Sequence, residues 1–216
     1  MADPDQAERI SAYLVAHSAP PDELVQRLRA ETAALGGVAQ MQISPDEGAF
    51  LTAIARLTQA RQAVEVGTFT GYSALCIARG LGPQGHLLCC DVSEEWTSIA
   101  RRYWAEAGLA DRIELRLGPA ADTLRALPNE ATLDLAFIDA DKIGYSTYWE
   151  EIVPRVRAGG AILVDNVLQG GGVVDEAATG DNVVAIRRFN DQVVADDRVD
   201  VAMLPIRDGV TLAVKR

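Results

Sequence analysis

A chain of 216 residues of which 49% are apolar is long enough to bury a core, and we expect residues 1–216 to form a single domain. The net charge of −11 argues against nonspecific binding to nucleic acid or to an anionic membrane. No apolar run approaches the ~20 residues of a membrane span, and the acidic start MADPDQAERI lacks the features of a signal peptide. We therefore expect a cytoplasmic protein.

Three helices are expected before the first strand, and they make residues 1–60 an amino-terminal helical extension. Residues 5–17 and 22–35 have amphipathic patterns, and the first of them places Ile10, Tyr13 and Leu14 on one side. The third helix opens with Ser44, Pro45 and Glu47, which predicts a capping box. Because these helices precede the sheet, they pack on its rim, on a partner subunit or over a site.

Strands and helices then alternate, which predicts a Rossmann-like, doubly wound α/β fold with helices on both faces of the sheet. The last two strands are joined by the short turn IRDG, so they should form an antiparallel hairpin on a mostly parallel sheet. The cysteines Cys89 and Cys90 fall within a strand and are interpreted as core residues on opposite faces. We expect strands at 63–67, 86–91, 112–117, 133–139, 161–165, 199–204 and 210–215, helices at 72–81, 94–107, 120–126, 145–156 and 183–195, and a flexible loop at 169–181.

The stretch AVEVGTFTGYS, residues 63–73, predicts a buried strand, a glycine turn and a helix start. Gly67 and Gly71 are too far apart for the GxGxxG fingerprint of a dinucleotide site. Glu65 would repel a phosphate but can accept a hydrogen bond from a hydroxyl or an amine. Any α/β protein needs some glycine at such a turn, so this stretch by itself leaves a purely structural role open.

Asp91 ends the second strand, 24 residues after Gly67, where an acid that binds a ribose diol usually lies. The helix that starts near Ser73 can attract the carboxylate at the other end of the ligand. An adenosyl ribose and an amino-acid carboxylate describe S-adenosylmethionine better than NAD. We therefore expect S-adenosylmethionine as a methyl donor.

Asp139 ends the fourth strand, and Asp165 with Asn166 ends the fifth. If these strands are neighbours, their ends lie about 4.8 Å apart, and the oxygen ligands suit Mg²⁺ best, with Mn²⁺ or Ca²⁺ as alternatives. Lys142 follows Asp139 closely and is a candidate general base. Any single one of these acids could instead cap a helix, and only their joint occurrence favours a site.

The chain resembles the cation-dependent O-methyltransferases, the group of caffeoyl-CoA and catechol O-methyltransferases, from about residue 41 to its end. The blocks that carry the resemblance are MQISPDEGAFL, VEVGTFTGYSAL, LGPA, FIDADK and VDN. The resemblance implies that Asp139, Asp165 and Asn166 bind the metal, that Lys142 is the general base, and that the protein is a homodimer. It also implies that Asp139 touches the methyl donor, together with Met41, Glu65, Gly67, Thr68, Ser73, Asp91 and Ala120, with Ala120 beside the adenine.

The expected activity is methyl transfer from S-adenosylmethionine to one hydroxyl of a catechol-like, vicinal-dihydroxy aromatic small molecule. Ile143 and Gly144 replace the Asp and Asn that the plant enzymes carry, so a coenzyme A thioester acceptor is not assumed. Tyr145, Trp149 and the amino-terminal helices are candidates for acceptor contacts, with core packing as the alternative. Two other functions stay open, a nicotinamide-dependent reductase on the same fold and a non-catalytic S-adenosylmethionine-binding protein, whereas a nucleic-acid methyltransferase is disfavoured by the acidic charge.

Overall fold

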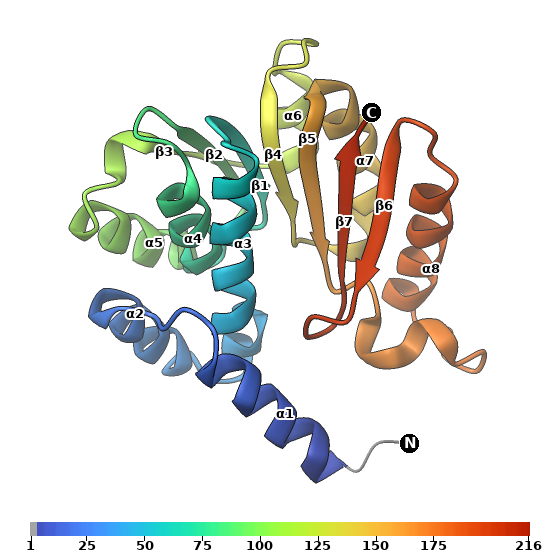
Figure 1. Ribbon diagram of the computed structural model, residues 1–216, viewed down its shortest axis with the longest axis horizontal. Coiled ribbons are helices and arrows are strands. Elements are labelled where there is room, and N and C mark those ends of the chain that lie inside the picture. Colours follow the sequence, from blue (N-terminus) through green and yellow to red (C-terminus); the bar gives the residue numbers. More distant parts are fainter. Residues whose placement is uncertain (1–3) are drawn as a thin grey trace.

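The computed structural model describes residues 4–216, and its helices cover both faces of one twisted sheet (Figure 1). The first three residues of the acidic start lie outside the described residues. Over residues 4–216 no helix combines the length and the apolar character that crossing a membrane requires.

The sheet has seven strands within the described residues, in the order β3-β2-β1-β4-β5-β7-β6. Strands β1 to β5 pair in parallel, and β7 pairs antiparallel with both β5 and β6. This order confirms the predicted doubly wound fold with its carboxyl-terminal hairpin, and it reverses direction between β1 and β4, where such sheets bind ligands. The strands are β1 (Gln62–Val66), β2 (His86–Asp91), β3 (Ile113–Leu117), β4 (Leu133–Ile138), β5 (Val156–Asp165), β6 (Val199–Leu204) and β7 (Val210–Lys215).

Each face of the sheet has its own apolar core, because alternate residues of a strand point to opposite sides. Cys89 belongs to one core and Cys90 to the other, as predicted, and both are buried free thiols, as is Cys76. The first core packs α2 (Glu23–Ala33), α3 (Pro45–Leu57), α4 (Tyr72–Gly80) and α5 (Glu94–Glu106), and the second packs α6 (Ala120–Arg125), α7 (Tyr145–Ile152) and α8 (Asp181–Val194).

Strand β5 starts five residues earlier than predicted, and the preceding helix is correspondingly shorter. Its partners on β4 are Leu133 opposite Val156 and Leu135 opposite Ala161, so the intervening residues form a bulge. Gly159 in this bulge has a φ of +74°, which favours glycine. The expected helix 145–156 ends at Ile152 and continues as a 3₁₀ turn, η4 (Val153–Arg155), because proline in this turn has no N–H for an α-helical bond.

The predicted capping box at the start of α3 lacks its serine hydrogen bond. Ser44 is the N-cap residue in an extended conformation, but its hydroxyl makes no capping hydrogen bond. The Glu47 side chain is 1% exposed, and its carboxyl lies beside both the Ser44 backbone amide and the Asp165 carboxylate. The first turn of α3 therefore carries a buried acid.

The amino-terminal helix α1 (Pro4–Ala16) leads away from the body of the molecule (Figure 1). Its apolar residues Ile10, Tyr13 and Leu14 are at least half exposed, so nothing in the described chain buries this face. The segment 169–181, expected as a loop, contains the 3₁₀ helix η5 (Gln169–Val174), and α8 begins at its last residue.

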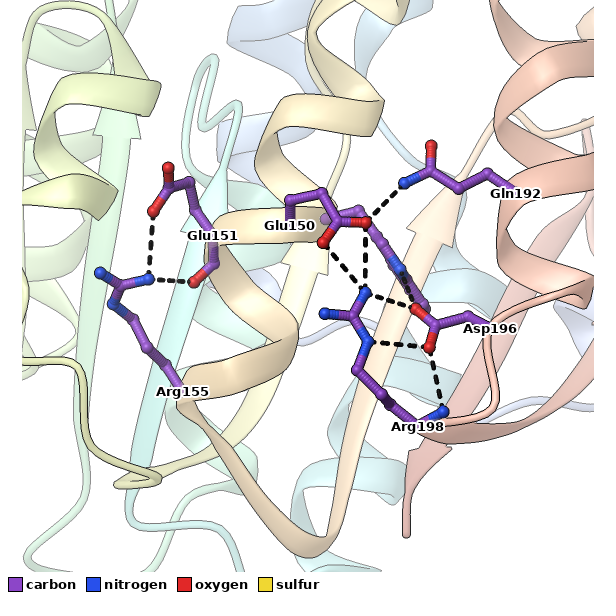
Figure 2. A network of polar contacts seen from close by, with 7 residues as sticks. Glu150, Glu151, Arg155, Gln192, Asp196 and Arg198 are labelled. Carbon is purple, nitrogen blue, oxygen red and sulfur yellow. Dashed lines mark hydrogen bonds and ion pairs between the residues drawn. The ribbon is translucent and has the colours of Figure 1, made fainter.

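A polar network fastens α7 to α8 and to the start of β6 (Figure 2). The Asp196 carboxylate accepts hydrogen bonds from Trp149 Nε1 at 2.8 Å and from Arg198 Nε at 2.8 Å. The Arg198 guanidinium lowers the pKa of Asp196 well below its usual range. Arg198 also pairs with Glu150 at 3.1 Å, and Gln192 on α8 donates to Glu150. These bonds fix the helix that begins beside the candidate site.

Candidate functional site

A cavity of about 1710 Å³ lies beyond the carboxyl ends of the parallel strands, where the strand order reverses. All the predicted site residues except Glu65 line it. These are Met41, Gly67, Thr68, Ser73, Asp91, Ala120, Asp139, Lys142, Asp165 and Asn166. The predicted convergence of strand ends on one crevice is thus present, although the roles of these residues stay predictions.

The turn after β1 is shaped by close backbone packing. Gly67 has a φ of +91°, and a Cβ atom at this position would lie 1.8 Å from the Asp139 carbonyl oxygen. The Asp139 amide in turn donates to the Val66 carbonyl at 2.8 Å. Only glycine fits there, and its contact brings the ends of β1 and β4 together.

Asp91 holds the same turn from the other side. Its Oδ2 accepts hydrogen bonds from the backbone N–H groups of Thr68 at 2.9 Å and Phe69 at 2.8 Å, and its Oδ1 accepts from Ser93 N at 2.8 Å. A carboxylate can accept about four hydrogen bonds, so Oδ1 keeps a free position on the cavity side. Asp91 can therefore order the turn and still bind a hydroxyl.

Glu65 lies behind the cavity wall instead of in it. It is fully buried, and its Oε2 accepts hydrogen bonds from Thr68 Oγ1 at 3.0 Å and Cys89 Sγ at 3.4 Å. Its Oε1 has no partner among the described residues, and burial raises the pKa of its carboxyl to about 8. Its evident role in this structure is to support the Thr68 side chain.

Asp139, Asp165 and Asn166 meet at the ends of the neighbouring strands β4 and β5, as predicted. Lys142 Nζ donates to Asp139 Oδ1 at 3.1 Å and to Asn166 Oδ1 at 2.8 Å. Burial raises the pKa of Asp139, and burial together with the Asp139 charge raises the pKa of Asp165 to about 7. Both shifts come first from burial, and the Asp139 charge adds to that of Asp165.

Tyr145 holds Lys142 in position from the core side and does not line the cavity. Its hydroxyl accepts from Lys142 Nζ at 2.6 Å and donates to the Asp165 carbonyl at 3.0 Å, and the ammonium lies 4.8 Å from its ring centre. Tyr145 and Trp149 are 0% exposed and pack edge-on against Phe189. Of the two alternatives stated for these aromatic side chains, acceptor contact and core packing, the structure shows core packing, because α7 turns that face into the core.

Glu47 is a site residue that the sequence analysis assigned to a helix cap. It lines the cavity from α3, its Oε1 has no partner among the described residues, and its carboxyl neighbours that of Asp165. Burial and the charges of Asp165 and Asp139 raise its pKa to about 9. The sequence pattern that could have revealed this role is the spacing of Glu47 with Leu51 and Ile54. This spacing places an acid on the apolar face of the helix.

The donor atoms fit a hard divalent cation. They are carboxylate and amide oxygens, and the Lys142 ammonium is the cation that contacts two of the three predicted ligands. Among the side chains that the structure describes, no three of His, Cys, Asp or Glu come close enough to hold a metal by themselves. The predicted set thus depends on the Asn166 amide.

The open side of the cavity is partly apolar. Ile10 and Leu14 of α1 line it, together with Ile143, which is 69% exposed. Arg207 and Asp208, from the turn between β6 and β7, lie at the same opening. Residues of the amino-terminal extension therefore border the cavity, which agrees with one of the arrangements expected from the sequence.

Comparison with known proteins identifies the relatives of this chain. The sequence model of a family described as "O-methyltransferase" matches residues 15–216. "Probable caffeoyl-CoA O-methyltransferase 1" of Dictyostelium discoideum is 42% identical over 179 residues, 81% of this chain and 78% of that protein. An O-methyltransferase from Bacillus cereus, solved with S-adenosylhomocysteine (SAH), superimposes with a TM-score of 0.87 at 33% identity and covers 96% of this chain and 97% of its own. An SAH-bound methyltransferase from Podospora anserina gives 0.90 at 28% identity, covering 100% of this chain and 97% of its own.

The family match extends over nearly the whole described chain and includes the turn after β1 and the ends of β4 and β5. It agrees with the resemblance carried by the motifs and leaves the nicotinamide-dependent reductase without support. The chain therefore belongs to the O-methyltransferase family, which confirms the predicted family and the prediction that the protein is an O-methyltransferase enzyme.

Proposed function

We propose that the protein transfers a methyl group from S-adenosylmethionine to one hydroxyl of a catechol-like, vicinal-dihydroxy aromatic small molecule, with the help of a divalent cation, Mg²⁺ first. One observation carries the proposal. A single cavity is lined both by the Gly67 turn with Asp91 and by the cluster of Asp139, Lys142, Asp165 and Asn166. Its volume of about 1710 Å³ exceeds the ~300–1,000 Å³ of an ordinary ligand pocket, so it has room for a donor and an acceptor.

The donor is assigned to the end of the cavity near β1 and β2. The free position on Asp91 Oδ1 suits a ribose hydroxyl, and Ala120 at the start of α6 leaves space for the adenine. The amino terminus of α4, with Ser73 in its first turn, attracts the carboxylate of the methionine part. The related structures solved with S-adenosylhomocysteine support S-adenosylmethionine as the donor.

The acceptor is assigned to the opposite end, where Asp139, Asp165 and Asn166 would hold the cation. A bound cation there supplies positive charge that stabilises a phenolate and orients its two adjacent oxygens. Lys142 Nζ contacts two of these residues, and in its neutral amine form it takes the proton of the attacking hydroxyl and becomes an ammonium. The hydroxyl oxygen bonds to the methyl carbon as the carbon–sulfur bond breaks, which leaves S-adenosylhomocysteine.

The nature of the acceptor is the finer part of the proposal. The apolar side chains of Ile10, Leu14 and Ile143 at the opening suit an aromatic ring. Relatives carry both names, caffeoyl-CoA and catechol O-methyltransferase, so a thioester tail is not required of the acceptor. We also expect a cytoplasmic homodimer, and sedimentation velocity would measure the mass in solution.

The test is a methyl-transfer assay with labelled donor, catechol, a flavonoid and caffeoyl-CoA, run with Mg²⁺ and after exhaustive chelation. Chelation should abolish turnover while titration calorimetry still detects S-adenosylhomocysteine binding. Asp165→Asn should lower kcat on the order of 100-fold or more, because it removes one charged ligand. Full activity after chelation would remove the cation from the proposal, and donor binding without turnover on any acceptor would favour a non-catalytic binding protein.

A further inference from the structure

The Glu47 carboxyl is buried in the wall of the cavity, beside the Ser44 amide and the Asp165 carboxylate. It is 1% exposed, and its Oε1 has less than 1 Å² of accessible surface and no hydrogen-bond partner among the described residues. A buried carboxylate oxygen without a donor destabilises a protein. Glu47 also lines the cavity, so a further partner for its carboxylate can come from there.

The charges around Glu47 do not balance. Glu47, Asp139 and Asp165 bring three carboxylates to the cavity, and the ion pairs of residues 4–216 include only one cation at these acids, Lys142 on Asp139. Lys142 Nζ donates hydrogen bonds to Asp139, Asn166 and Tyr145, and it donates none to Glu47. With all three acids ionised, the cluster keeps two negative charges, which is the charge that one divalent cation neutralises.

Direct coordination by all three acids is not what the geometry offers. Among the described side chains, no three acidic ones lie close enough for that. Magnesium usually keeps several of its own water molecules, and groups in the outer shell of a metal site commonly hold such waters. The Glu47 carboxylate on α3, a hydrogen-bond acceptor that lines the same cavity as the ends of β4 and β5, is in such a position.

Building on the proposed function, we infer that Glu47 is an outer ligand of the divalent cation held by Asp139, Asp165 and Asn166, and that its carboxylate accepts a hydrogen bond from water bound to that cation. The cation then connects the first turn of α3 with the ends of β4 and β5. Glu47 is thereby a positioning residue that sets the affinity for the metal without touching the acceptor.

The experiment measures Mn²⁺ binding to the full-length protein in the absence of donor and acceptor, by electron paramagnetic resonance of free Mn²⁺. Glu47→Gln should bind Mn²⁺ 10- to 100-fold more weakly than wild type, the usual cost of losing an outer-shell partner. Glu95→Gln, which removes an equal charge from an exposed position on α5, should bind like wild type.

Melting temperatures with and without Mn²⁺ separate this role from a structural one. The metal-free Glu47→Gln protein should melt no lower than wild type, and its increase on adding Mn²⁺ should be smaller. Binding within twofold of wild type, or equal loss of melting temperature with and without metal, overturns the inference. If wild type binds no Mn²⁺, the proposed cation dependence fails and the inference fails with it; if only the Glu47 effect is missing, the inference alone fails.

Discussion

Replacing Glu65 by glutamine should change how the stability of the protein depends on pH. The Glu65 carboxyl is fully buried, and burial raises its pKa from 4.5 to about 8. Between these two values the native protein holds a proton that the unfolded chain has released. Stability of wild type therefore falls as pH rises through this interval, by about 1.4 kcal/mol per pH unit for this group.

The full interval corresponds to about 5 kcal/mol, and the part between pH 5 and pH 7 to about 3 kcal/mol. Glutamine is a good mimic of the protonated acid, because its carbonyl can keep the bonds from Thr68 and Cys89. Any cost of placing its amide at the unpartnered Oε1 position is independent of pH. The other buried acids contribute to both proteins and cancel in the difference.

Urea denaturation of wild type and Glu65→Gln at half-unit steps from pH 4 to pH 9, without donor, measures this difference. The free energy of unfolding of the variant, relative to that of wild type, should increase from about pH 4.5 upward and level off above about pH 8. Glu95→Gln, at an exposed position, should follow the wild-type curve. Parallel curves for wild type and Glu65→Gln would refute the reasoning, because they would mean that Glu65 is ionised in the folded protein as it is in the unfolded chain.

Three further substitutions test the supports of the site. Gly67→Ala should lower the free energy of unfolding by about 3 kcal/mol or prevent folding, because its Cβ would meet the Asp139 carbonyl at 1.8 Å. Gly82→Ala is the control, because a Cβ there meets open space. Urea denaturation compares the two, and a stable Gly67→Ala protein would contradict the geometry. Tyr145→Phe removes the partner of Lys142 at 2.6 Å and should lower kcat about 5- to 10-fold with little change in donor affinity, so unchanged kinetics would argue against a positioning role. Asp196→Ala leaves the Trp149 indole N–H without its partner and should lower the free energy of unfolding by about 2–3 kcal/mol. Glu150→Ala, at an exposed ion pair, should lower it by less than about 1 kcal/mol. Equal losses in chemical denaturation would refute this interpretation of the network.

Much of the fold was predictable because it depends on local patterns. The alternation of strand and helix fixes a parallel sheet with right-handed crossovers, and the IRDG turn is too short for anything except a hairpin. The boundaries of β5 were not predictable, because the bulge around Gly159 depends on how β5 pairs with β4. Pairing between distant segments leaves little trace in a local pattern.

The candidate site divides in the same way. The sequence by itself determined that Asp91, Asp139 and Asp165 end parallel strands, and parallel strands present those ends at one edge of a sheet, so their meeting follows from topology. Only the tertiary structure decided where side chains on helices and behind turns point. Glu47 faces the cavity, Glu65 lies behind the wall, and Trp149 packs in the core.

The physical reason is that strand ends are placed by hydrogen bonds along the backbone, which repeat regularly from one strand to the next. A helix instead rotates to whatever angle buries its apolar face, and that angle depends on partners far away in the sequence. Glu47 meets Asp165 across more than a hundred residues, because α3 packs beside α4 against the sheet. The acids at the strand ends could therefore be predicted from the sequence, whereas the acid on α3 required the packed structure.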